Sequence, residues 1–285
     1  MVQAMIQEAH PNTDVEIVPI KTSGDRGERE VLGAFVREIQ ESLLANQIDV
    51  ALHCLKDLPT QQVPGLTFAA HLTREDSSET IITRGSEWTH LPAGAVIGTG
   101  SVRRTSQIAA IRSDVQFKPL VGNVDTRLRK LQEGVYDAIV LATAGLKRLG
   151  LLANWKDSEY AGLRVEHLPI VPAAGQAVLV LEVRSGDSVE SIIATFNDEP
   201  TRLASIAERA FLKHFGTGCS MPVAASATVI EGALRLDGLV ASVDGTTILS
   251  GHEIGEPASA EQVGIALAQR LCDKGARELI TGGAT

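Results

Sequence analysis

The order of apolar and polar residues predicts alternating helices and strands in the first part of the chain. Residues 1–10 have the pattern of a helix end, and residues 14–20 alternate polar and apolar side chains as a strand does. Residues 35–45 carry apolar side chains at helical spacing, and residues 48–52 form a short apolar run that suits a buried parallel strand. A helix followed by a strand in this way indicates an α/β layer.

The same order of elements recurs in the middle of the chain, where it predicts a βαβ domain of its own. The expected strands and helices cover residues 95–101, 103–112, 115–121, 125–134 and 136–144. After an irregular stretch at 155–172, residues 175–183 predict a further strand. Residues 200–215 predict an amphipathic helix that is closed by Gly216 and Gly218.

The last part of the chain predicts a small α+β domain. Strands expected at 225–230, 233–242 and 246–254 would form a three-stranded antiparallel sheet, followed by a helix at 260–276. The length of 285 residues agrees with two domains, or with three compact ones.

Composition argues against binding to nucleic acid or to a membrane. Lys and Arg total 26 against 35 Asp and Glu, so the net charge is −9 and any anion site has to be built locally. The three cysteines are odd in number and far apart, which suits a reducing compartment and neither a disulfide framework nor a metal site. With no leader sequence and no apolar run of membrane-spanning length, we expect a cytoplasmic protein without a metal.

Lys56 and Asp57 follow the strand expected at residues 48–52. Open α/β sheets bind ligands beyond the ends of their strands, and an acid beside a base can bind charge or move protons. The alternative is an ordinary solvated turn before Pro59. Spacing alone favours the solvated turn.

Residues 98–101 have the sequence Gly-Thr-Gly-Ser and open a helix that carries Arg103 and Arg104 in its first turn. Backbone N–H groups, hydroxyl groups and two guanidinium groups meet there, and such groups hold carboxylates or phosphates. Cations in a first helical turn oppose the helix dipole and cost stability unless an anion joins them. An anion site and an ordinary helix surface are therefore both open.

Other cations and one cysteine also allow two interpretations. Arg127 and Arg148 each follow a loop or strand end, so each is either a solvated residue or part of one cationic cleft. Cys219 lies in a glycine-flanked turn, where a thiol is either reactive or, like most lone cysteines, inert. His53 and His71 have no serine or metal-ligand partner at a useful spacing, so triads and zinc sites have no support.

Six segments carry a family resemblance. They are HCLKDLP at 53–59, GTGSVRR at 98–104, GNVDTRLRKL at 122–131, YDAIVLATAGLKRLGL at 136–151, PAAGQAVLVLEV at 172–183 and AERAFLKHFGTGCSMPVA at 207–224. In this order they resemble the porphobilinogen deaminase (hydroxymethylbilane synthase) family over nearly the whole chain. Several motifs in one order are far more specific than any one of them.

The resemblance implies a transferase that joins four porphobilinogen molecules head to tail with loss of ammonia. It implies a dipyrromethane primer attached covalently to Cys219, and Asp57 as the catalytic carboxylate. The carboxylates of the pyrroles need guanidinium partners, and loss of ammonia leaves an electron-poor ring that needs a carboxylate. The implied cofactor-binding residues are Lys56, Thr99, Ser101, Arg103, Arg104 and Arg127. The implied substrate-binding residues are Arg148 and Asp25.

The fold class that the resemblance implies is α/β. Two domains like those of type II periplasmic binding proteins are joined by a double hinge, and a small α+β domain carries the cysteine. The implied boundaries are 1–72 with 172–194 for the first domain, 77–167 for the second and 198–285 for the third. The resemblance also implies a monomer.

The chain departs from the family pattern at several positions. It begins inside the first helix, so the first strand and its anion ligands are expected to be missing, and the segment 25–35 is shorter than usual. Leu32 and Val121 stand where a lysine and an arginine are expected, while Cys54 and Ala177 replace the usual serine and glycine. Each lost charge-assisted contact weakens carboxylate binding by roughly 1.5–3 kcal/mol.

These departures keep a second function open, that of a non-catalytic two-domain protein which binds a small anion. A solute-binding ancestry alone does not predict both Asp57 and Cys219. The sequence therefore favours the enzyme, and the covalent primer is the feature that separates the two functions.

Overall fold

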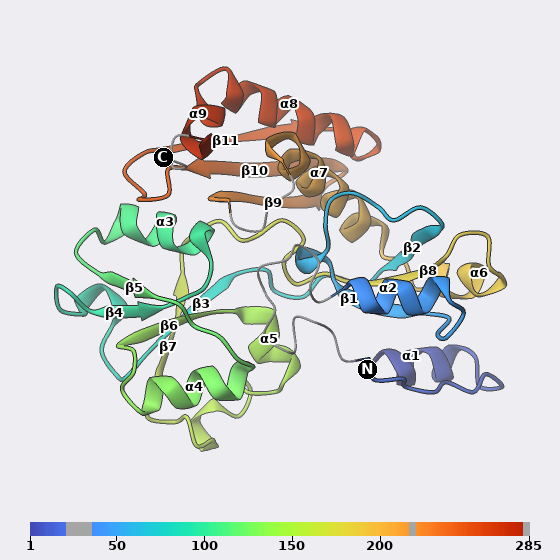
Figure 1. Cartoon of the computed structure of the whole chain (residues 1–285), viewed down its shortest axis with the longest axis horizontal. Helices are drawn as coiled ribbons and strands as arrows, with labels where there is room; N and C mark the ends of the chain where they lie inside the picture. Colours follow the sequence, from blue (N-terminus) through green and yellow to red (C-terminus); the bar gives the residue numbers. More distant parts are fainter. Residues whose placement is uncertain (21–35, 217–220, 282–285) are drawn as a thin grey trace.

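The computed structural model describes residues 1–20, 36–216 and 221–281. Its elements gather around three sheets, which form three groups in Figure 1. The first group combines blue elements with yellow ones from later in the chain, the second is green, and the third is orange to red. The chain therefore leaves the first group, builds the second and returns to the first before it forms the third.

The first sheet has three strands in the order β1-β8-β2. Both β1 (Ala51–Cys54) and β2 (Leu66–His71) pair antiparallel with β8 (Leu179–Arg184). The strand predicted at 175–183 is thus present, whereas the buried parallel strand predicted at 48–52 is wrong in orientation and begins later. Side chains of β1 alternate between buried and exposed, as an antiparallel sheet with one open face allows.

Three helices accompany this sheet: α1 (Val2–Ala9), α2 (Arg37–Leu44) and α6 (Ser188–Ala194). Ile6 of α1 and Ile193 of α6 belong to one apolar cluster with side chains of β2 and β8. The strand predicted at 14–20 is wrong, because this segment has no regular structure and leaves Ile17 68% exposed. An alternating pattern forms a strand only beside a partner strand, and none pairs with these residues in the part of the chain that is described.

The second sheet has five strands in the order β5-β4-β6-β3-β7. They are β3 (Glu79–Thr83), β4 (Val96–Gly98), β5 (Gln116–Lys118), β6 (Ala138–Ala142) and β7 (Arg164–Leu168). Its helices are α3 (Val102–Ile111), α4 (Val124–Gln132) and α5 (Thr143–Arg148). Strand β4 runs parallel to β5 and β6, so the predicted βαβ arrangement is confirmed.

Two strands of this sheet were not expected: β3 lies in a segment for which no element was predicted, and β7 lies inside the stretch 155–172 that was predicted to be irregular. The sequence of β7, RVEHL, is mostly polar and gives no apolar alternation. Pairing with β3 supplies the hydrogen bonds that make it an edge strand.

The third sheet is antiparallel, as predicted, and its strand order is β11-β10-β9. Its strands are β9 (Val223–Ile230), β10 (Ala233–Ala241) and β11 (Ile248–Gly255), and its helices are α7 (Glu199–Phe215), α8 (Ala260–Cys272) and α9 (Ala276–Thr281). Helices α7 and α8 pack closely at Gly264, where a Cβ atom would lie 2.3 Å from the carbonyl oxygen of Ala207. The α+β class of the last domain is confirmed.

The described residues also form four short 3₁₀ turns: η1 (Leu55–Asp57), η2 (Trp88–His90), η3 (Trp155–Asp157) and η4 (Pro257–Ser259). Two connections link the first and second sheets, one from β2 to β3 and one from β7 to β8, which is what a double hinge requires. Among the described residues, no helix combines the length and apolar character that a membrane span needs.

Candidate active site

Lys56 and Asp57 lie in η1, directly after β1. Leu55 anchors this turn, since its side chain is buried and its N–H donates to the carbonyl oxygen of Val178 at 3.0 Å. Lys56 Nζ donates to Oε1 of Gln176 at 3.3 Å. The turn therefore presents two opposite charges beside the connection that returns from the second sheet.

The surrounding protein moves both charges of η1 toward their neutral forms. Burial lowers the pKa of Lys56, while the charge of Asp57 opposes that shift. Burial also raises the pKa of Asp57, and the charges of Lys56 and Arg127 oppose it. The residue Asp57 is still exposed to solvent. Its carboxyl group is therefore desolvated by the protein atoms that surround it, although the residue is not fully buried. A carboxylate with a raised pKa next to cations is typical of a functional site.

Arg103 and Arg104 lie in the first turn of α3 and turn their side chains into the protein, where only 5% and 8% of the residues are exposed. The Nη2 atom of Arg103 lies 2.6 Å from Oε1 of Glu79, and Nη2 of Arg104 lies 2.6 Å from Oε2. Strand β3 thus supplies a counter-charge that the sequence pattern did not reveal. The charges of both arginines and of Glu79 also act on the pKa of Lys56, which places this cluster near η1.

Thr99 and Ser101 shape the loop that leads from β4 into α3. Thr99 is buried, and its Oγ1 accepts the N–H of Ser101 at 3.2 Å. Ser101 occupies the N-cap position of α3, but its side chain makes no capping hydrogen bond. Gly98 is required here, because a Cβ atom would lie 2.8 Å from the ring of Tyr136. The loop is therefore held close to the sheet by local contacts.

Arg127 of α4 and Arg148 of α5 lie near η1, because their charges act on the pKa values of Asp57 and of Cys54, the residue before the turn. Arg127 Nε donates to the carbonyl oxygen of Gly122 at 2.7 Å, and its charge lowers the pKa of Asp57. Arg148 is exposed at the end of α5 and donates from Nη2 to the carbonyl oxygen of Ala177 at 2.7 Å. The structure thus brings the predicted cations of the second group to the neighbourhood of one turn of the first group.

Asp25, Leu32 and Cys219 lie outside the described residues. Their assignments, including the attachment of a primer to Cys219, stay predictions. Val121 is described and is 48% exposed, in keeping with a position that an arginine side chain could occupy.

Three residues at the site were missed by the sequence analysis: Glu79, Gln176 and Arg209. Gln176 is fully buried and donates to the carbonyl oxygen of Ser77, so it joins both connections as well as Lys56. Arg209 of α7 donates to the carbonyl oxygen of Pro59 at 2.7 Å, just beyond η1. Gln176 and Arg209 lie inside two of the six family segments, 172–183 and 207–224, and this was the available sequence signal for them, whereas Glu79 lies outside all six.

His53 has a partner that spacing could not predict. Its Nε2 lies 3.0 Å from Oε2 of Glu182 on β8, and both side chains are buried. Within the described ranges, no group of three or more histidine, cysteine or acidic side chains is arranged to hold a metal ion.

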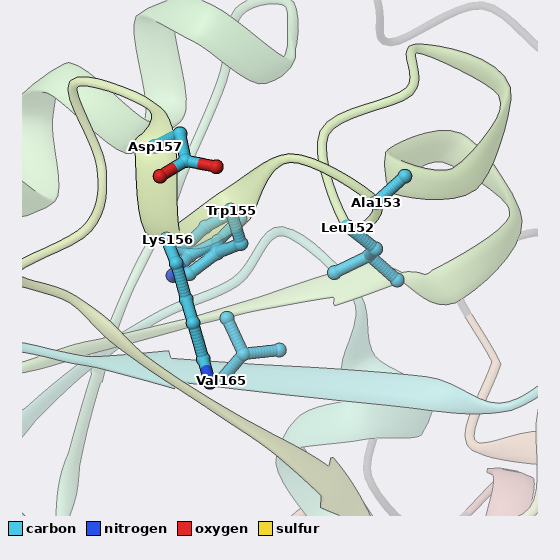
Figure 2. A pocket seen from close by; sticks show the side chains of 6 residues that line it. All are labelled: Leu152, Ala153, Trp155, Lys156, Asp157 and Val165. Carbon is cyan, nitrogen blue, oxygen red and sulfur yellow. The ribbon is translucent and has the colours of Figure 1, made fainter.

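A cavity of about 390 Å³ lies elsewhere, beside β7 and the turn η3. Figure 2 shows that Trp155 and Val165 lie at this cavity together with Lys156 and Asp157. None of the predicted site residues lines it, so this cavity is not part of the site around η1.

The fold and the site define a class of protein, one in which two sheet-containing units bring arginines of one unit close to an acid–base pair of the other. The chain belongs to the porphobilinogen deaminase family. The family description "Porphobilinogen deaminase, dipyromethane cofactor binding domain" matches residues 1–191, and "Porphobilinogen deaminase, C-terminal domain" matches residues 202–273. The resemblance on which the sequence analysis relied is therefore confirmed.

Curated relatives support the same family over nearly the whole chain. A porphobilinogen deaminase from Thermus thermophilus is 42% identical, with 96% of this chain and 91% of the relative covered. Those from Roseiflexus sp. and Chromobacterium violaceum are 41% and 40% identical, covering 99% and 98% of this chain and 93% and 91% of the relatives.

Solved structures with similar folds are more distant. The periplasmic VFT2 domain of Bordetella pertussis BvgS is 18% identical at a TM-score of 0.41, with 68% of this chain and 73% of that chain covered. An ancestral cationic amino acid solute binding protein is 13% identical at a TM-score of 0.40, with 68% and 75% covered.

Proposed function

We propose that the chain is a hydroxymethylbilane synthase, a transferase of tetrapyrrole and haem biosynthesis. It joins four porphobilinogen molecules head to tail, releases one ammonia at each junction and starts from a covalent dipyrromethane primer. Family membership across nearly the whole chain supports this function. The single observation that carries it is the turn with Lys56 and Asp57, whose charges interact with those of Arg103, Arg104 and Arg127.

The residues present fit the dipyrromethane cofactor, whose side chains are carboxylates. Two buried guanidiniums share one internal carboxylate, so one positive charge is left over. Nε of Arg104 is buried and has no hydrogen-bond partner among the described residues. The cofactor would be held covalently by Cys219 and by ionic or polar contacts with Lys56, Thr99, Ser101, Arg103, Arg104 and Arg127. When bound, it supplies the free pyrrole position to which the first substrate is joined.

Asp57 is the proposed catalytic carboxylate. Loss of ammonia from porphobilinogen leaves an electron-poor ring, and a fixed negative charge beside it lowers the energy of that state. The carboxylate form is the active one, and burial raises its pKa, so activity is expected to fall with acid at a higher pH than an ordinary aspartate would give.

Arg148 and Asp25 are the proposed substrate-binding residues. Arg148 holds the carbonyl oxygen of Ala177 in this structure, and a substrate carboxylate is the stronger partner for a guanidinium. Binding is therefore expected to exchange one partner for the other. For the domains we propose boundaries of 1–72 with 172–194, 77–167 and 198–285, in a cytoplasmic monomer.

The test is the variant Asp57→Ala, compared with Asp157→Ala. Both aspartates end a 3₁₀ turn, but Asp157 lies in η3, outside the proposed site. Asp57→Ala is expected to lower kcat by at least a hundredfold, the size of a typical acid–base or charge-stabilising contribution, while Asp157→Ala stays within twofold of the unchanged protein. Turnover of porphobilinogen is followed by ammonia release.

Intact mass, measured with the reaction of Ehrlich's reagent for pyrroles, tests the cofactor separately. A mass excess equal to dipyrromethane, mapped to Cys219, is expected for the unchanged chain and for Asp57→Ala. An unmodified mass after incubation with preformed hydroxymethylbilane would reject the enzyme and favour the non-catalytic anion-binding relative. Full turnover by Asp57→Ala would reject only the role of that carboxylate.

A further inference from the structure

Two adjacent arginines of α3 share one carboxylate from another element. Nη2 of Arg103 donates a hydrogen bond to Oε1 of Glu79, and Nη2 of Arg104 donates one to Oε2, both at 2.6 Å. Each oxygen of Glu79 therefore serves one guanidinium. Charge-assisted hydrogen bonds of this length are the strong ones, and they fix direction as well as distance.

A second contact fixes the plane of each guanidinium. Nη1 of Arg103 donates to the carbonyl oxygen of Val171 at 2.8 Å, and Nη1 of Arg104 donates to that of Val140 at 3.0 Å. A planar group held at two of its nitrogens cannot rotate freely. The pair is thus set in place before any ligand arrives.

Glu79 is itself rigidly mounted. It is the first residue of β3, an inner strand, and it pairs with Ala142 of β6 on one side and Leu168 of β7 on the other. Its surface is fully buried. Burial alone would raise its pKa, but the charges and hydrogen bonds of Arg104 and Arg103 outweigh burial and lower the pKa to about 2. The carboxylate is therefore ionised at neutral pH.

The charges of this cluster do not cancel. Two buried cations face one anion, and a buried charge without a partner is strongly unfavourable. Without Glu79 the cluster would carry two excess positive charges, and with Glu79 it carries one. In addition, Nε of Arg104 lacks a hydrogen-bond partner within the described ranges. An incoming carboxylate can supply what remains.

We propose that Glu79 is a positioning residue for primer binding: it holds Arg103 and Arg104 at fixed orientations with one positive charge in excess, ready for a carboxylate of the pyrrole chain. This inference rests on the proposed function. Glu79 acts through the two guanidiniums and needs no contact with substrate.

The test compares Glu79→Gln, which keeps the shape and removes the charge, with Glu79→Asp, which keeps the charge. Glu166→Gln is the control, because Glu166 lies on the neighbouring strand β7 and pairs with the exposed Arg164. The full chain is prepared free of pyrrole and incubated with preformed hydroxymethylbilane, and attachment of dipyrromethane is followed by intact mass. Circular dichroism and the thermal midpoint establish which variants are folded.

Glu79→Gln is expected to load the primer at least tenfold more slowly, and Glu79→Asp and Glu166→Gln to stay within threefold of the unchanged chain. Once loaded, Glu79→Gln is expected to lose kcat tenfold with KM for porphobilinogen within twofold. The reason is that the arginine pair holds the primer, whereas incoming substrate is assigned to Arg148. General loss of structure would lower the folded fraction, which circular dichroism detects. It would not produce a folded variant that loses kcat tenfold while KM stays within twofold.

Loading of Glu79→Gln at the unchanged rate would overturn the proposal, and so would a kcat and KM that change together. If Glu79→Gln does not fold, Glu79→Asp decides: tenfold slower loading by a folded Glu79→Asp overturns the proposal, and loading within threefold supports it. Failure of the unchanged chain to gain mass would instead overturn the proposed function, so the two failures are distinct.

Discussion

His53 and His71 lie on β1 and β2 of the same sheet, and the two buried side chains meet different surroundings. His53 faces the carboxylate of Glu182 at 3.0 Å. His71 has no hydrogen-bond partner for Nδ1 in the described part of the chain, and the charges that act on its pKa are those of Arg202, Arg209 and, in the opposite direction, Glu199. Burial, assisted by these two cations, lowers the pKa of His71 to about 4.

This shift predicts a loss of stability in acid. An unfolded histidine binds its proton near pH 6.5, whereas folded His71 does so near pH 4, so in between the unfolded state binds more protons. The free energy of unfolding should therefore fall by about 3 kcal/mol from this residue alone as the pH drops across that window. Urea unfolding of His71→Leu at pH 7, 6 and 5 should show a flatter pH dependence.

The control for this prediction is His252→Leu, because His252 is exposed on β11. It should keep the pH dependence of the unchanged chain. Identical slopes for His71→Leu and the unchanged chain would show that His71 is not held neutral by its surroundings.

At the scale of elements, the connection from β7 to β8 bears on the site most directly. Ala177 in this connection has a φ of 69°, a left-handed conformation that is unfavourable for residues other than glycine. Its carbonyl oxygen accepts from Arg148 of α5 and from the N–H of Glu75 in the other connection. The strained residue is therefore the point at which both connections and the second group meet.

Ala177→Gly is expected to raise the free energy of unfolding by up to about 1 kcal/mol, because glycine adopts this backbone conformation without strain. Ala174→Gly, three residues earlier at a buried position without a positive φ, is expected to lower it by about 1 kcal/mol. Denaturant unfolding of both variants measures the difference. If Ala177→Gly lowers the free energy of unfolding as much as Ala174→Gly does, the backbone at Ala177 is not strained.

At the scale of the whole molecule, α7 ties the third group to the other two. The fully buried Glu208 accepts from Arg74 Nη1 at 2.5 Å, from the N–H of Gly175 at 2.6 Å and from the N–H of Ala227 at 2.6 Å. Arg74 belongs to one connection, Gly175 to the other and Ala227 to β9. A single carboxylate thus links both connections to the third sheet.

Glu208→Gln should lower the free energy of unfolding by about 3 kcal/mol, because it leaves the largely buried charge of Arg74 without its counter-ion. Glu199→Gln removes an exposed carboxylate from the same helix, paired with Arg202, and should cost less than about 1 kcal/mol. Chemical denaturation measures both. Equal effects of the two variants would show that the buried network is not what holds α7 to the connections.

Much of the architecture could be predicted because it depends on neighbours in the chain. The strands β9, β10 and β11 and the helices α3 and α7 follow from apolar periodicity within a few residues. Segments whose structure depends on a distant partner were missed. The mostly polar edge strand β7 forms because it pairs with β3. Residues 14–20 alternate polar and apolar side chains, but no described strand pairs with them, so they do not form a strand.

The sequence by itself determined the class of elements, the ordered motifs that place the chain in its family, and the acid–base pair Lys56–Asp57 beyond a strand. Only the tertiary structure decided which charges meet. Glu79 lies 24 residues from Arg103, and Glu208 lies 134 residues from Arg74, yet each pair forms a buried ion pair. Periodicity records which side chains face a core, whereas a buried charge is stable only where folding brings its counter-charge within hydrogen-bond distance.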